Sequence, residues 1–120
     1  MKYGVVGNRV GWTKEQVFNG LKKVGINSQD IIVSGGARGV DTFAQEYAKM
    51  VGSIFIIMYP KPELSISKRY FERNRRIVVP DLKITKIDEL IAFDKKEYSG
   101  TLNTINQARD AGSHIVEYKE

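Results

Sequence analysis

Short apolar segments alternate with amphipathic helical patterns along this sequence, and no other feature restricts the fold as strongly. Between residues 40 and 51, apolar side chains recur three and four positions apart, which predicts a helix with one buried face. The expected strands are five apolar runs: residues 3–6, 31–33, 54–58, 90–93 and 114–118. This alternation is typical of α/β folds with a mainly parallel sheet. We therefore predict a small Rossmann-like, three-layer α/β/α sandwich with the five strands in the order 3-2-1-4-5.

Local signals place the ends of the expected helices. Thr13 and Gln16 have the spacing of a capping box, so the first helix should begin just after Thr13. Gly25 follows that helical pattern directly and is a natural C-terminal stop. Further helices are predicted at residues 40–51, at 67–79, and from about 101 to 112, and residues 83–87 are left open as an additional short element.

Length and residue usage exclude several classes of protein. The 120 residues fit one domain, residues 1–120. The chain has no cysteine, which excludes disulfides, thiol catalysis and cysteine-based metal sites. The only histidine, His114, begins the last predicted strand far from any nucleophile, so we expect it to be structural or solvated. We expect no metal and no cofactor.

The charge balance permits an anionic partner without identifying one. The formal net charge is +5, which suits a nucleotide, a phosphorylated metabolite or nucleic acid, and equally an ordinary solvated surface. No apolar run approaches the ~20 residues needed to span a bilayer. The first ten residues, MKYGVVGNRV, do not resemble a signal peptide. We therefore expect no membrane partner and a cytoplasmic location.

Glycine-containing turns follow three of the predicted strands. Carboxyl ends of parallel strands share one edge, where glycine lets the backbone approach an anion beside a helix N-terminus. The candidate ligand-binding residues are Gly7, Asn8 and Arg9; Ser34, Gly35, Gly36, Ala37, Arg38, Gly39 and Asp41; and Ser99, Gly100 and Thr101. Asp41 could cap the following helix or accept a bond from a ribose or base. The turns match neither a Walker loop nor the dinucleotide fingerprint, and tight turns without a ligand are the alternative.

The segment SKRYFERNRRIV, residues 67–78, is unusually basic. On a helix, Arg69, Arg73 and Arg76 would share one face. Three interpretations stay open. The helix could present a solvated surface, a phosphate clamp directed at the glycine turns, or a nucleic-acid patch. In the second, Arg73 and Asn74 are candidate ligand-binding residues.

Three blocks of the sequence together resemble the SLOG superfamily: IVSGGARGVDTFAQEYA, FERNRRIV and DELIAFDKKEYSGTLNTINQA. This superfamily joins the DNA-processing protein A (Smf) family with the Lonely Guy cytokinin-activating phosphoribohydrolases. The similarity covers residues 2–118 and is nearest to a minimal, single-domain relative of the DNA-processing proteins. It implies a Rossmann-like domain that binds a nucleotide or nucleotide-derived ligand. Relatives often form homodimers, so a homodimer or higher homo-oligomer is expected, and Tyr70 or Phe71 could serve its interface.

The resemblance also bears on catalysis. In the phosphoribohydrolase branch, an arginine and a glutamate carry N-glycosidic cleavage, and Arg73 matches that arginine. Gly100 and Thr101 match the Gly-Thr pair that precedes the glutamate, but the glutamate position is Thr104. Without this acid, a developing oxocarbenium ion or an attacking water loses its anionic partner. Arg73 is thus the one candidate catalytic residue, and whether the chain is an enzyme stays open.

Three functions follow from these observations. We expect binding of a nucleotide or nucleotide-derived phosphorylated ligand at the glycine-rich edge, with sensing or processing left open. The first alternative is an N-glycosidic hydrolase of nucleoside monophosphates, with Asp41, Asp94 or Glu97 replacing the missing glutamate. The second is a single-stranded nucleic-acid-binding protein related to DNA-processing protein A.

Overall fold

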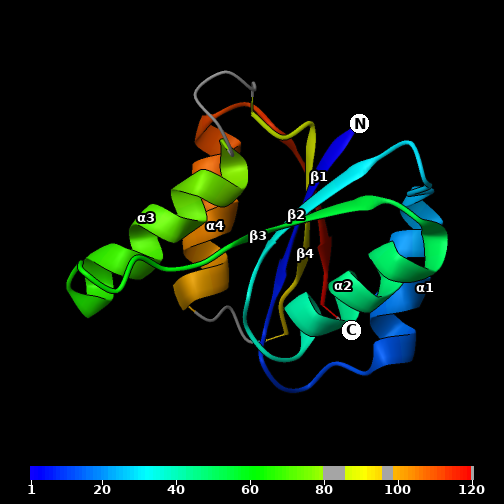
Figure 1. Cartoon of the computed structure of the whole chain (residues 1–120), viewed down its shortest axis with the longest axis horizontal. Coiled ribbons are helices and arrows are strands. Elements are labelled where there is room, and N and C mark those ends of the chain that lie inside the picture. The colour runs from blue at the N-terminus through cyan, green and yellow to red at the C-terminus, as the bar shows by residue number, and fades with distance from the viewer. Residues whose placement is uncertain (80–85, 96–98, 120) are drawn as a thin grey trace.

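A computed structural model describes residues 1–79, 86–95 and 99–119 (Figure 1). In chain order its elements are β1 (Lys2–Gly7), α1 (Lys14–Val24), β2 (Ile31–Gly35), α2 (Val40–Val51), β3 (Ile54–Met58), α3 (Ile66–Val78), β4 (Glu89–Phe93), α4 (Ser99–Asp110) and β5 (His114–Tyr118). The five strands form one parallel sheet in the order β3-β2-β1-β4-β5. The predicted fold class and strand order are confirmed. Each expected element is present, with ends that differ by two residues at most.

Helices cover both faces of this sheet, α1 and α2 on one face and α3 and α4 on the other (Figure 1). Successive side chains of a strand point to opposite faces, so Val5 packs with α1 and α2 while its neighbour Val6 packs with α3 and α4. Ile32 and Val33 of β2 divide in the same way. Because both faces of the sheet are buried at its centre, β2 and β4 carry continuous apolar runs, residues 31–33 and 90–93, rather than alternating ones.

The strand order reverses between β1 and β4, near the centre of the sheet. β1 pairs with β4 as far as Gly7, whereas its pairing with β2 ends at Gly4 and Val33. Beyond that point the hydroxyl oxygen of Ser34 lies 2.6 Å from the carbonyl oxygen of Val5. In open α/β sheets, ligands bind in the crevice at such a reversal. The fold therefore directs attention to the carboxyl end of β1.

The sequence signals for the ends of α1 act as predicted. The Thr13 hydroxyl accepts a bond from the Gln16 amide at 3.1 Å, and the Gln16 side chain accepts one from the Thr13 amide at 2.9 Å. This is the expected capping box. Gly25 ends the helix in the left-handed conformation with φ 89°, which favours glycine.

Other expectations have simpler outcomes. Of the segment 83–87, residues 83–85 lie outside the described residues, and Ile87 is a buried part of the core. His114 is exposed, with its Nδ1 3.2 Å from the Glu89 carboxylate at the amino ends of their strands. Within the described residues, no helix has the length and apolar character that crossing a membrane requires.

We expect Thr13→Ala to lower the free energy of unfolding by about 1 kcal/mol, because it removes the hydroxyl that accepts from the Gln16 amide, whereas the bond donated by the backbone amide of residue 13 can remain. Urea unfolding followed by far-UV circular dichroism measures the change. Thr13→Ser keeps the hydroxyl and is the matched control, so an equal loss in both variants would contradict the role of the box.

Candidate functional site

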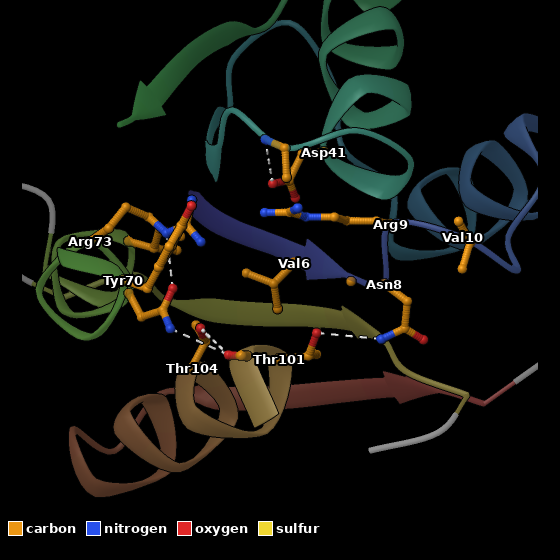
Figure 2. Close-up of a pocket in the computed structure, with 14 residues that line it drawn as sticks. Val6, Asn8, Arg9, Val10, Asp41, Tyr70, Arg73, Thr101 and Thr104 are labelled. Carbon is orange, nitrogen blue, oxygen red and sulfur yellow. Dashed lines mark hydrogen bonds between the residues drawn. The ribbon is translucent and has the colours of Figure 1, made fainter. Parts of the chain in front are cut away.

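A pocket of about 410 Å³ opens at the carboxyl end of β1 (Figure 2). It lies between the turns after β1 and β2 on one side and helices α3 and α4 on the other. Its lining residues are Val6, Gly7, Asn8, Arg9, Val10, Ala37, Asp41, Tyr70, Arg73, Asn74, Ile77, Gly100, Thr101 and Thr104. This volume falls within the range of roughly 300–1,000 Å³ that is typical of small-molecule sites.

Among the described residues, the basic and acidic side chains on the lining are the guanidinium groups of Arg9 and Arg73 and the carboxyl group of Asp41. Figure 2 shows Arg9 reaching from the turn after β1 toward Asp41, and Arg73 approaching the same region from α3. Within the described part of the chain, the Arg9 side chain makes no hydrogen bond or ion pair. The terminal nitrogens of Arg73 likewise make none there, because its one side-chain bond uses Nε. Both groups can therefore bind an anion.

The direction of Arg73 is set by its neighbours. Its Nε donates to the Asn74 side-chain oxygen at 2.9 Å. The Asn74 amide nitrogen in turn donates to the Gly100 carbonyl at 3.3 Å and to the Asn103 side chain at 3.1 Å, which ties α3 to α4. A Cβ at Gly35 would collide with the Arg73 guanidinium, so the glycine is what admits this group. Burial lowers the pKa of Arg73, and the nearby Asp41 opposes that shift.

The Asp41 side chain contacts both ends of the segment that leads from β2 into the glycine turn. One carboxyl oxygen lies 2.9 Å from the Ser34 hydroxyl, and the other accepts a bond from the Ala37 amide at 3.2 Å. The cap position of α2 is occupied by Gly39, which makes no side-chain bond, so the interpretation of Asp41 as the cap is wrong. Asp41 lies two positions too late, inside the first turn, and its carboxyl group faces back to the preceding loop.

Asp41 is only 7% exposed. Burial raises the pKa of its carboxyl group to about 6, although the hydrogen bonds with Ser34 and the Ala37 amide, and then the positive charges of Arg73 and Arg9, act in the opposite direction. Removal from water disfavours the charged form of an acid, and here this cost exceeds the attraction of the two guanidinium groups. A pKa near neutrality is the property expected of a group that exchanges protons during function.

Asn8 connects the turn after β1 to the residues after β4 and to the first turn of α4. Its amide nitrogen donates to Asp94 at 3.0 Å and to Thr101 at 3.5 Å. Its side-chain oxygen accepts from the Lys95 amide at 2.9 Å and from the Trp12 indole at 3.3 Å. These four bonds use the full capacity of the side chain. Asn8 therefore positions the edge of the pocket.

The structure brings together nine of the predicted ligand-binding residues. Those that line the pocket are Gly7, Asn8, Arg9, Ala37, Asp41, Arg73, Asn74, Gly100 and Thr101. Those outside its lining are Ser34, Gly35, Gly36, Arg38 and Gly39, and the Ser99 side chain is not among those the structure describes. Several glycines of the turn serve protein contacts instead, since a Cβ at Gly36 would meet the Tyr59 ring and one at Gly39 the backbone of Arg9. Gly39 also has φ 77°, which a side chain would strain.

Sequence reasoning missed the apolar part of the lining, Val6, Val10, Tyr70 and Ile77. Two of these had a usable signal, because Tyr70 and Ile77 lie three residues before and four residues after Arg73 and so share its helix face. Thr104, considered only for the glutamate it replaces, also lines the pocket and donates to the Gly100 carbonyl at 3.2 Å.

The other arginines of α3 are bound within the protein. Arg69 donates to the carbonyl oxygens of Pro62 and Leu64 at 2.9–3.1 Å. Arg76 forms an ion pair with Glu72 at 2.7 Å, and it also donates to the backbone ahead of the helix. Arg73 is thus the arginine of this helix that faces the pocket.

No protein-family model matches the chain, and neither curated proteins nor solved structures give a significant match. The relation to the SLOG superfamily therefore stays a prediction. Among the described residues, no group of three or more histidine, aspartate and glutamate side chains could hold a metal ion. Of the acids considered for catalysis, Asp41 lines the pocket, Asp94 does not, and Glu97 lies outside the described residues.

The raised pKa of Asp41 predicts a pH-dependent cost to stability. The native state holds a proton on this group up to about pH 6, whereas the unfolded chain releases it near 3.8. Stability from this group is therefore present below pH 3.8 and lost as pH rises through about 6. We expect Asp41→Asn to gain stability relative to wild type by up to roughly 3 kcal/mol between pH 4 and pH 7.5.

Urea unfolding of both proteins at several pH values measures this difference. Asp110→Asn makes the same chemical change at an exposed position of α4 and is the control. A difference between Asp41→Asn and wild type that stays constant with pH would contradict the proton on Asp41.

Proposed function

We propose that this chain binds a nucleotide or nucleotide-derived phosphorylated ligand in the pocket at the carboxyl end of β1. The observation that carries the proposal is the pair of guanidinium groups, Arg9 and Arg73, whose terminal nitrogens make no hydrogen bond to other described residues and lie on the lining. Guanidinium groups bind phosphate through paired, charge-assisted hydrogen bonds.

The rest of the lining suits the remainder of such a ligand. Val6, Val10 and Ile77 offer apolar contact, and the Tyr70 ring offers a surface on which a base could stack. Tyr70 is 37% exposed, and the Arg73 guanidinium carbon lies 5.5 Å from its ring centre. An anion-binding end beside an apolar end is the division that a nucleotide requires.

The resemblance to the SLOG superfamily adds to this proposal, because Arg73 is the residue it singles out. On the same basis we propose a cytoplasmic protein that forms a homodimer or higher homo-oligomer. Phe71, 56% exposed, and Leu102, 39% exposed, are apolar side chains on the outer surface of the two packed helices α3 and α4. Such exposed apolar side chains suit an interface.

We expect Arg73→Ala to weaken nucleotide binding by roughly 10- to 100-fold, because the variant loses charge-assisted hydrogen bonds to the phosphate. Isothermal titration calorimetry with a panel of nucleoside monophosphates measures the affinities. The matched control is Arg75→Ala, an exposed arginine two positions along the same helix that pairs with Glu72 and does not line the pocket.

Equal losses in both variants would contradict the pocket and favour the nucleic-acid alternative, in which the exposed surface of α3 binds the phosphate backbone. That alternative has less support from the contacts described above, because Arg69 and Arg76 are held by carbonyl groups and by Glu72. It also predicts binding that weakens steeply as salt is added.

A second candidate function is N-glycosidic hydrolysis of nucleoside monophosphates. The observation that favours it is Asp41, an acid on the pocket lining whose pKa is raised by burial to about 6. A general acid works best when its pKa lies near the operating pH. Here Asp41 would take the place of the glutamate whose position is Thr104.

Incubation of the protein with nucleoside monophosphates, followed by chromatography for free base, tests this candidate. We expect Asp41→Asn to remove any base release, because an amide cannot exchange the proton. Release that survives Asp41→Asn would exclude Asp41 as the acid, and absence of free base from wild type would leave binding as the function.

A further inference from the structure

Ser34 stands between two groups that both require a hydrogen from it. Its hydroxyl oxygen lies 2.6 Å from the Val5 carbonyl and 2.9 Å from the Asp41 carboxyl oxygen Oδ1. A serine hydroxyl carries one hydrogen and two lone pairs, so it donates fully to one of these groups. The Val5 carbonyl can only accept.

The geometry favours donation to Val5. That contact is the shorter of the two, and it lies where the pairing of β1 with β2 has ended at Gly4 and Val33. Val5 and Ser34 are fully buried, and a buried carbonyl without a partner costs free energy. With the Ser34 hydrogen directed to Val5, the contact with Asp41 is a hydrogen bond only when Asp41 supplies the hydrogen.

The second oxygen of Asp41 is compatible with either protonation state. Oδ2 accepts from the Ala37 amide, which both a carboxylate and the carbonyl oxygen of a neutral acid can do, and this bond opposes the raised pKa. The charged groups that act on Asp41 are Arg9 from the turn after β1 and Arg73 from α3, which also contributes the titratable Tyr70. From α4, the described side chains on the lining are the neutral Thr101 and Thr104.

We propose that Asp41 is a neutral acid hydrogen-bonded to Ser34 when the pocket binds its anion, and that loss of this proton weakens anion binding. The proposal rests on the proposed function of the pocket as an anion site. A neutral Asp41 leaves both guanidinium charges for the ligand, whereas a carboxylate opposes them with a negative charge. By linkage, a bound anion must also hold the proton more tightly. Burial alone raises the pKa of Asp41 to about 6, and a Ser34 hydroxyl that donated to the carboxylate would oppose that rise.

Carboxyl carbon NMR tests the proton on Asp41 without any ligand. In protein labelled at aspartate carboxyl carbons, the resonance lost in Asp41→Asn identifies the group. We expect its midpoint near pH 6, and a midpoint at or below the ordinary aspartate value of ~3.9 would overturn the proposal.

Ser34→Ala then tests the direction of the bond. A hydroxyl that accepts from the acid stabilises the neutral form, so its removal lowers the midpoint, whereas a hydroxyl that donates to the carboxylate would give a rise. A rise would therefore overturn the role of Ser34. Amide NMR spectra check that Ser34→Ala folds. If this variant does not fold, the titration midpoint of Asp41 in the wild-type protein still decides its protonation state.

Calorimetric titration with sulfate from pH 5 to pH 8 tests the linkage. Sulfate stays a dianion over this range, whereas a phosphate monoester itself titrates near pH 6. We expect wild-type affinity to fall roughly tenfold as pH rises, from the repulsion between carboxylate and anion. In Asp41→Asn the affinity should be independent of pH, because no proton is gained or lost at this position. Asp110→Asn, the control, should fall as wild type does.

The outcomes separate this proposal from the proposed function. Sulfate binding that is independent of pH in wild type would overturn the linkage and leave the anion site in place. No sulfate binding at any pH would overturn the anion site and the linkage together, even with an Asp41 midpoint near pH 6.

Discussion

The side-chain amide of Asn8 holds together the edge of the sheet on which the pocket depends. Its four hydrogen bonds reach the indole ahead of α1, the residues after β4 and the first turn of α4. The partners after β4 and in α4 lie 86 residues or more from Asn8 in the sequence. The pocket opens where the strand order reverses, and Asn8 ties the turn after β1 to the residues after β4 and to α4 beside it. The guanidinium groups of Arg9 and Arg73 and the carboxyl group of Asp41 line the pocket beside this edge.

Charge in the pocket is arranged unevenly. The Arg9 side chain and the terminal nitrogens of Arg73 make no hydrogen bond to other described residues, whereas the other arginines of α3 are bound to carbonyl groups and to Glu72. The one acid among them is buried and turned toward the loop that it supports. Desolvation therefore does more than attraction to decide the charge of Asp41. When Asp41 is protonated, the pocket has the positive charges of Arg9 and Arg73 without an opposing carboxylate.

The fold and the location of the site could be predicted because the signals are local. Apolar periodicity, the Thr13 capping box and glycine stops act within one turn of helix or one strand, and the carboxyl ends of parallel strands must converge. Contacts within the site could not be predicted in this way. The role of Asn8 depends on the approach of β4 and α4, and that of Asp41 on the path of the loop from Gly35 to Gly39. Helix spacing placed Arg69 beside Arg73, but its carbonyl partners belong to a separate loop.

Asn74 gives the site a mechanical connection to its surroundings. The same side chain accepts from the Arg73 guanidinium and donates to Gly100 and Asn103 of α4. The orientation of the Arg73 guanidinium therefore depends on the position of α4 as well as on its own helix. Any sliding of α4 along α3 turns this group relative to the sheet. The relative position of α3 and α4 thus affects the orientation of Arg73 in the pocket.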